Sequence, residues 1–319
     1  LKRDRMALIG KAALTAIIPM LSMSMLMAVI LLACNKTPLA DGMLNSIPLA
    51  VISSAIAIPT ARQLNSHFRE FIVYESSLSD ILGILLFNFF AVNQLVTGHS
   101  LLTFLSQLAI MLMLSVTATF GLAWLLSHTR QKIRFMPLIL MVILIYSISK
   151  LYHLPGLLFI MVLGLFLGNL GIFPQNRLIR YLRPESLAVE VDKFRELTAE
   201  VTFLVRSLFF ILFGFLMKTE DIINISSLPW SLGIVMLILA TRALQLRLSR
   251  LPLKPLLFIA PRGLITILLF LSIPLTRSIP VINSSVIIQV IVMSSLIMAA
   301  GSFATEGKQN VAPVNESNT

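Results

Sequence analysis

Residues 75–90 read ESSLSDILGILLFNFF, so two carboxylates, Glu75 and Asp80, stand at the start of a long apolar run. With its neighbours the run covers residues 74–96, close to the length of about 20 residues that a helix needs to cross a bilayer. An ionisable side chain is costly inside a membrane, and its presence there points to a function. The stretch therefore predicts a transmembrane helix that carries at least one functional carboxylate.

Beyond this stretch, the composition of the chain is that of a membrane protein. Of the 319 residues, 57% are hydrophobic and 12% are charged, against about 25% charged residues in a soluble domain. Apolar runs of bilayer length recur along the sequence and predict an all-α, polytopic membrane protein with about ten transmembrane helices. The predicted spans are 12–34, 43–61, 74–96, 101–127, 135–152, 154–173, 201–217, 229–246, 255–275 and 282–304.

The net charge of +11 follows the membrane topology and gives no reason to expect a nucleic-acid partner. If the N-terminus is cytoplasmic and the loops alternate sides, the outer loops hold only Lys36, Lys218 and Arg277. The other loop Lys and Arg residues then lie on the cytoplasmic side, as the positive-inside rule requires. The pattern predicts that both ends of the chain are cytoplasmic, and the short loops indicate a bacterial inner membrane.

Residues 1–304 predict one membrane domain. Its core helices are placed in 12–96 and 229–304, and the intervening spans in 101–217. The longest loop, 174–200, mixes both charge signs, which suits an amphipathic helix on the inner membrane face. The polar residues 305–319 are expected to form a disordered cytoplasmic tail. The first apolar run is too long for a signal peptide, so we expect a true span and a chain that starts inside a longer protein.

Four ionisable residues lie too deep inside predicted spans to reach the surface easily: Glu75, Asp80, Arg242 and Arg262. Glu75 and Arg242 lie at similar depth near the cytoplasmic ends of their spans, so we expect them to form an ion pair. Asp80 is five residues further along, about 140° around the helix, and so faces different surroundings. Ser76 shares the face of Asp80, since residues i and i+4 are neighbours on a helix.

A carboxylate that faces a water-accessible cavity can hold either a proton or a metal cation. Competition between the two for Asp80 is the physical basis of coupled exchange. The alternative is that Asp80 only bonds to a neighbouring helix. For Glu75 the structural ion pair is the favoured interpretation, and a functional carboxylate is the alternative.

Two predicted spans are interrupted by proline. Pro59 lies inside the second span, and Pro261-Arg262-Gly263 lies inside the ninth. Proline removes a backbone donor and breaks a helix, and the flanking Ser53, Ser54 and Thr60 can bond to the freed backbone groups. A broken helix in each half of a transporter is the best sequence pointer to a binding site near the middle of the membrane.

With these features the sequence resembles the sodium/proton antiporter family, a branch of the monovalent cation:proton antiporters. The family pattern Glu-Ser-x-x-Asn-Asp matches residues 75–80, and the family's broken helix with Thr-Asp-Pro matches Val51–Leu64. Further segments agree in the same order, namely His153–Asn169, Leu208–Phe215, Ala240–Arg242 and Arg262-Gly263. The resemblance covers residues 12–304 and implies an inverted-repeat core with two broken, crossing helices. It also implies that the family's first spans are missing from this chain.

The resemblance assigns a role to each ionisable residue inside the spans. Asp80 is the carboxylate that binds the transported cation, Na+ in the first place, or the proton. Ser76 would supply a side-chain oxygen to the ion. Glu75 and Arg242 would form the family's structural ion pair, and Arg262 would stabilise the crossing of the two broken helices.

The sequence departs from the family pattern at the ion site. The Asn that precedes the key Asp is replaced by Ser79, and the Thr-Asp of the broken helix is replaced by Ala57-Ile58. Ala57 would still supply a backbone carbonyl at the helix break, and Thr60 would partly replace the lost side-chain oxygen. Ser79 stays among the residues expected to bind the ion or the proton. Hard cations prefer several oxygen ligands, so the affinity or the selectivity is expected to differ. With one carboxylate at the key site, we expect electroneutral one-for-one exchange.

The leading interpretation is a secondary active transporter that exchanges Na+, Li+ or K+ for H+ by alternating access. It needs no cofactor, and the family suggests a homodimer in the lipid bilayer. A degenerate membrane protein with a sensory or scaffold role is the competing interpretation, which Ile58 and Ser79 favour. An enzyme is disfavoured, because the spans contain no HExxH, no GxSxG and no paired catalytic aspartates. A channel would not need a single titrating carboxylate.

Overall fold

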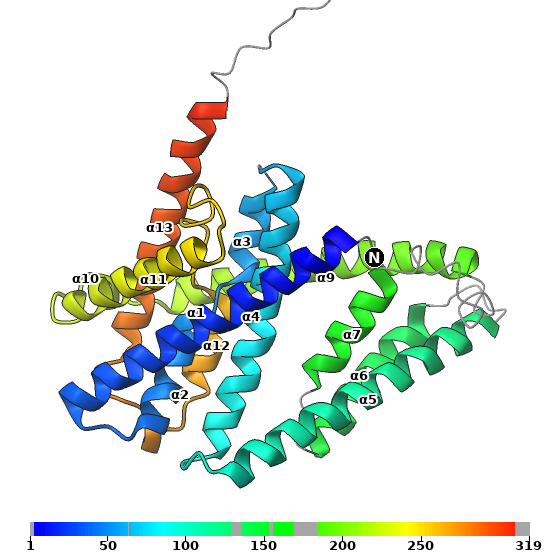
Figure 1. Ribbon diagram of the computed structural model, residues 1–319, viewed down its shortest axis with the longest axis horizontal. Coiled ribbons are helices and arrows are strands. Elements are labelled where there is room, and N and C mark those ends of the chain that lie inside the picture. The colour runs from blue at the N-terminus through cyan, green and yellow to red at the C-terminus, as the bar shows by residue number, and fades with distance from the viewer. Residues whose placement is uncertain (1–2, 63, 129–134, 153–155, 169–183, 310–319) are drawn as a thin grey trace, which may run out of the picture. The chain divides into compact units, whose positions relative to one another are not determined.

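The computed structural model of the chain describes residues 3–62, 64–128, 135–152, 156–168 and 184–309, which are all-helical apart from turns and short extended segments (Figure 1). Within these residues, seven helical segments are long and apolar enough to cross a membrane, and Ile139–Leu151 is a shorter apolar helix. The predicted class, an all-helical multi-pass membrane protein, is confirmed. The number of ten spans stays a prediction. The helices form two compact units, which are described separately.

The first unit comprises residues 1–95 and 212–319. Its helices are α1 (Arg3–Asn35), α2 (Leu39–Ala50), α3 (Ser54–Ala61), α4 (Ser66–Val92), α10 (Thr219–Ile223), α11 (Leu228–Leu248), α12 (Leu264–Leu271), η2 (Leu275–Arg277) and α13 (Ser284–Gln309). Helix α1 packs on α2, α4 and α11, and α4 also contacts α2, α3 and α12. Among the C-terminal helices of this unit, α13 packs on α10 and α11. Helix α4, which carries Asp80, therefore contacts both pieces of the first broken helix as well as α12.

The second unit comprises residues 96–211. Helices α5 (Gly98–His128), α6 (Phe135–Leu151) and α7 (Leu157–Gly168) pack on one another, and α9 (Pro184–Leu216) begins here and ends in the first unit. The inner-face helix predicted in 174–200 and the span predicted at 201–217 are one continuous helix from Pro184 onwards; residues 174–183 lie outside the described part. The reason is local, because Pro184 suits the start of a helix and no Gly or Pro follows it before Gly214.

Two helix ends differ from the prediction. Helix α4 begins at Ser66, because Asn65 caps it by accepting a hydrogen bond from the Phe68 N–H at 3.1 Å. The span was predicted to begin only at residue 74, because the first turns of the helix after Ser66 are polar. Helix α13 continues to Gln309, so the prediction of a disordered tail is wrong for residues 305–309, and residues 310–319 lie outside the described part.

The first break lies at Val51–Ser53, between α2 and α3, and not at Pro59. Pro59 is inside α3, whose short length leaves few hydrogen bonds for it to remove. The backbone N–H groups of the break find partners elsewhere in the fold. The Ile52 N–H donates to Ser79 Oγ at 3.0 Å, and the Ser53 N–H donates to the Pro261 carbonyl at 2.9 Å. Lipid offers no hydrogen-bond partners, so backbone groups inside a membrane must bond within the protein. These tertiary hydrogen bonds replace the helical ones that the break removes.

The second break occupies residues 259–263, directly before α12. The bond from Ser53 to Pro261 joins it to the first break, so the two interruptions meet here; residues 254–258, ahead of the second one, form turns. The contact is tight, because a Cβ on Gly263 would lie 2.8 Å from Ser53 Oγ. Both predicted interruptions are therefore present and lie together, with the first break six residues before Pro59 at Ser53.

Gly83 of α4 makes a second close approach. A Cβ on Gly83 would lie 2.2 Å from Val51 Cγ2. Because Val51 belongs to the first break, Gly83→Ala is expected to push the break away from α4. Overpacking of this kind costs about 1 to 3 kcal/mol, and thermal unfolding of the purified protein in detergent would measure it. Gly233→Ala in α11 is the matched control, since a Cβ there meets nothing within 4 Å. Equal midpoints for the two variants would contradict the prediction.

Candidate functional site

Asp80 lies on α4 beside the start of α3. Its Oδ2 accepts a short hydrogen bond from the Ser54 hydroxyl, and the side chain is partly buried. Ser54 is the first residue of α3 and follows the first break directly. The N-terminus of a helix carries a partial positive charge that favours a negative group nearby. The carboxylate is thus held at the break by a hydroxyl and faces the positive end of a half-helix.

The other predicted ligands each have a local hydrogen bond. The Ser76 hydroxyl donates to the Ile72 carbonyl at 2.7 Å, and the Thr60 hydroxyl donates to the Ile56 carbonyl at 3.0 Å. These bonds use the hydroxyl protons and leave oxygen lone pairs for a cation. Ala57 is buried inside α3, one turn past the break where its carbonyl was expected.

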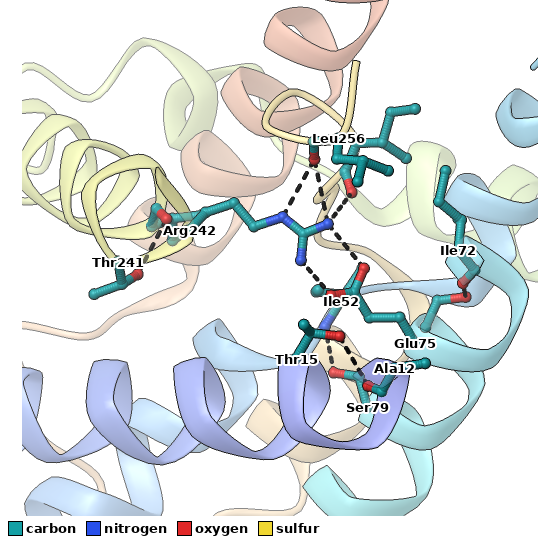
Figure 2. Close-up of polar contacts among 12 residues, drawn as sticks. Ala12, Thr15, Ile52, Ile72, Glu75, Ser79, Thr241, Arg242 and Leu256 are labelled. Carbon is teal, nitrogen blue, oxygen red and sulfur yellow. Dashed lines mark hydrogen bonds and ion pairs between the residues drawn. The ribbon is translucent and has the colours of Figure 1, made fainter. Parts of the chain in front are cut away.

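Ser79 is tied to the first break. It is fully buried, and its Oγ accepts the bond from the Ile52 N–H (Figure 2). This bond satisfies a backbone donor that the extended segment leaves without a helical partner. In the structure Ser79 therefore shapes the break that lies beside Asp80.

Glu75 and Arg242 form a buried bidentate ion pair. Arg242 Nη1 lies 2.5 Å from Glu75 Oε1, and Nη2 lies 2.8 Å from Oε2. The guanidinium also donates from Nε and Nη2 to the Leu256 carbonyl, both at 3.2 Å (Figure 2). Both side chains are no more than 3% exposed. The pair joins α4 to α11 and to the segment that precedes the second break. Both oxygens of the Glu75 carboxylate accept hydrogen bonds from Arg242.

Arg262 lies in the second break and is buried. Its backbone N–H donates to Ser294 Oγ of α13 at 3.1 Å, and its Nη2 approaches Met23 Sδ of α1 at 3.8 Å. Its side chain lines a small cavity that Thr15 and Arg242 also line. Arg262 thus contacts α1 and α13 from the second break.

The model of one protein family, described as the transmembrane sodium/hydrogen exchangers, matches residues 1–305. The chain belongs to the sodium/hydrogen exchanger family. Members of this family are transporters, and membership supports the exchange of a cation for a proton across the membrane.

A solved structure agrees with this exchanger in fold. The sodium proton antiporter MjNhaP1 from Methanocaldococcus jannaschii, determined at pH 8, superposes with a TM-score of 0.64 at 18% sequence identity. The match covers 95% of this chain and 79% of MjNhaP1. Among curated proteins, none matches the sequence of the exchanger significantly. At this identity the structural likeness shows the shared fold, and it is the family match that carries the assignment.

A second ion pair of the exchanger, which is partly buried, was missed by sequence reasoning. Arg277, counted only as an outer-loop charge, has its Nε 2.6 Å from Asp41 Oδ1 of α2. Its Nη1 donates to the Phe90 and Ala91 carbonyls at the end of α4, at 2.8 and 2.9 Å. A cation is favoured at this end of a helix, where the last carbonyls lack partners. Asn45 completes the cluster by donating to the Arg277 carbonyl at 2.9 Å.

Arg277→Gln is expected to loosen this cluster. It would leave Asp41 without its partner and would remove the cap from the last turn of α4, at a cost of about 1 to 3 kcal/mol because the pair is only partly buried. The midpoint of thermal unfolding in detergent would fall accordingly. Lys218→Gln is the control, since it removes an exposed positive charge that was likewise predicted to lie in an outer loop. A midpoint that does not differ from that of Lys218→Gln would show that the cluster contributes nothing measurable.

Proposed function

We propose that this exchanger carries Na+ in one direction and H+ in the other by alternating access, with Li+ and K+ as the alternative cations. The observation that carries the proposal is the Asp80 carboxylate, placed on α4 against the first residue of α3 at the break. Half-helix ends and unwound backbone at a transporter's midplane are the usual surroundings of an ion site. The family match supports the same function.

The proposed mechanism uses the competition of two cations for one carboxylate. Ionised Asp80 binds either Na+ or H+, so the arrival of one releases the other. Glu75 takes no part, because both of its oxygens are engaged by Arg242. One negative charge then exchanges one monovalent cation for one proton, and the transport cycle is electroneutral. Ser76, Thr60 and the Ala57 carbonyl are proposed to add oxygen ligands, while Ser79 holds the break in place.

Reconstitution of the purified protein into liposomes that enclose a pH-sensitive dye tests this function. A pH gradient is imposed, and Na+, Li+ or K+ is then added outside. We expect proton movement that depends on the cation and that is unchanged when valinomycin and K+ clamp the membrane potential. Proton movement with none of the three cations, from protein that unfolds cooperatively, would refute the proposal. The second candidate, a sensor or scaffold without transport, would then take its place because of Ile58 and Ser79.

We further propose a bacterial inner membrane as the location, with both ends of the chain in the cytoplasm. The support is the distribution of Lys and Arg, since the predicted outer loops hold only Lys36, Lys218 and Arg277. The homodimer that the family suggests likewise stays a prediction.

A further inference from the structure

We propose that the Ser54 hydroxyl is a direct ligand of the transported cation and, with Asp80, forms the selective part of the site. The proposal rests on the exchange function proposed above and assigns a residue that sequence reasoning gave only a backbone role. In the structure the Ser54 hydroxyl donates to Asp80 Oδ2 from the first turn of α3. Its oxygen therefore already lies beside the carboxylate that the cation must reach.

The hydroxyl can change from donor to ligand without moving the backbone. A serine hydroxyl has one proton and two lone pairs, and rotation about its C–O bond decides which of them faces a neighbour. When Asp80 is ionised and empty, the proton faces the carboxylate. When a cation sits on the carboxylate, a lone pair faces the cation instead. Ser54 thereby stabilises the empty site and the occupied site with the same oxygen.

The face of α3 that meets Asp80 offers few other side-chain oxygens. Residues four apart share a helix face, and the residue one turn beyond Ser54 is Ile58, which carries no oxygen. Ser53, the residue before α3, is buried; its backbone N–H donates to the Pro261 carbonyl, and its hydroxyl oxygen lies beside Gly263 of the second break. Ser54 thus supplies an oxygen from α3 directly beside Asp80, whereas the Thr60 hydroxyl, further along α3, donates to the Ile56 carbonyl.

The chemistry of this pair indicates the class of cation. One carboxylate and one neutral hydroxyl provide hard oxygen ligands and a single negative charge. Hard ligands suit Na+ and Li+, and a single charge balances a monovalent ion better than a divalent one. A proton needs only the carboxylate, because protonated Asp80 is complete without a second ligand. Loss of the Ser54 oxygen should therefore weaken the binding of the metal cation more than that of the proton.

Kinetics of the reconstituted protein test the inference. We expect Ser54→Ala to raise the KM for Na+ about tenfold, which corresponds to a loss of about 1.4 kcal/mol. The maximal rate at saturating Na+ should stay within about twofold, because uniform loss of binding leaves the chemistry of exchange intact. Ser54→Thr keeps the hydroxyl and should retain the wild-type KM. Ser77→Ala, which removes a hydroxyl from α4 near Asp80, is the matched control.

A direct binding measurement separates this inference from the function on which it rests. Na+ should raise the unfolding temperature of the wild type and of Ser77→Ala, because a ligand stabilises the folded state that binds it. The rise should need about ten times more Na+ in Ser54→Ala. Ser54→Cys, which keeps the shape of the side chain but replaces the hard oxygen by a larger, soft sulfur, covers the case that the alanine variant does not fold.

The outcomes are distinct. Equal Na+ dependence in Ser54→Cys, Ser54→Ala and Ser77→Ala would overturn the role of Ser54 and leave exchange at Asp80 standing. Neither transport nor a cation-dependent unfolding temperature in the wild type would instead refute the proposed function. A raised KM in Ser54→Ala and Ser54→Cys, together with a normal KM in Ser54→Thr, supports the hydroxyl as a cation ligand.

Discussion

Asp80→Asn is expected to abolish cation-dependent proton movement, with a fall in rate of at least about 100-fold. Asparagine keeps the size of the side chain and an oxygen that can accept the Ser54 hydroxyl bond, but it neither ionises nor holds a proton. The proposed exchange needs the negative charge of Asp80, because Na+ and H+ compete for the ionised carboxylate. The measurement is the rate of internal pH change in dye-loaded proteoliposomes after Na+ is added.

The fold should survive this substitution, since the contact with Ser54 can be kept. We expect the midpoint of thermal unfolding in the absence of Na+ to lie close to that of the wild type. Glu70→Gln, which removes a carboxylate near the N-terminal end of the same helix, is the control and should transport normally. Normal exchange by Asp80→Asn would remove Asp80 from the ion site, whatever the other variants do.

Removal of either partner of the Glu75–Arg242 pair is expected to reduce stability severely. Glu75→Gln leaves a buried guanidinium without its counter-charge, and Arg242→Met leaves a buried carboxylate without its two donors. Breaking one side of a buried pair costs about 3 to 5 kcal/mol. The free energy of unfolding, or the unfolding temperature in detergent, would report this loss.

The double variant, with Glu75→Gln and Arg242→Met, is expected to be more stable than either single variant. It removes both charges, so no uncompensated charge remains buried. The difference between the double variant and the sum of the single variants measures the coupling of the two side chains. Single variants that unfold like the wild type would show that the pair does not hold α4 to α11.

The two carboxylates of α4 are thus expected to separate stability from transport. Asp80→Asn should lose transport and keep the fold, whereas Glu75→Gln should lose stability first. Five residues apart, they lie on different sides of the helix, and their partners in the structure differ accordingly. The opposite pattern, with transport lost first at Glu75, would exchange the assigned roles.

Features that depend on one helix at a time could be predicted from the sequence. The composition and the apolar runs predicted an all-helical membrane protein, because the bilayer requires each crossing segment to satisfy its own backbone. Depth along two such segments and opposite charge were enough to suggest the pairing of Glu75 with Arg242, which the structure contains as a bidentate contact. Two interrupted helices were also visible, because proline and glycine mark such points in a sequence.

Features that depend on a partner far along the chain could not be predicted. The first break lies at Val51–Ser53, because Ser79 and the Pro261 carbonyl accept hydrogen bonds from its N–H groups. The sequence had predicted the break at Pro59, six residues later. Arg277 is buried, and its ion-pair partner is Asp41, which lies 236 residues away in the sequence. Each of these arrangements is stabilised by contacts that exist only after the helices have packed.

The sequence by itself determined the kind of protein and the carboxylate on which the proposed exchange depends. These follow from the cost of placing polar and charged groups in lipid, a cost that each segment bears alone. Only the tertiary structure decided where the first helix breaks and which hydroxyl meets Asp80. Ser54 reads in sequence as an ordinary residue at a helix start, and it becomes a candidate ligand because α3 packs on α4 with that residue facing the carboxylate.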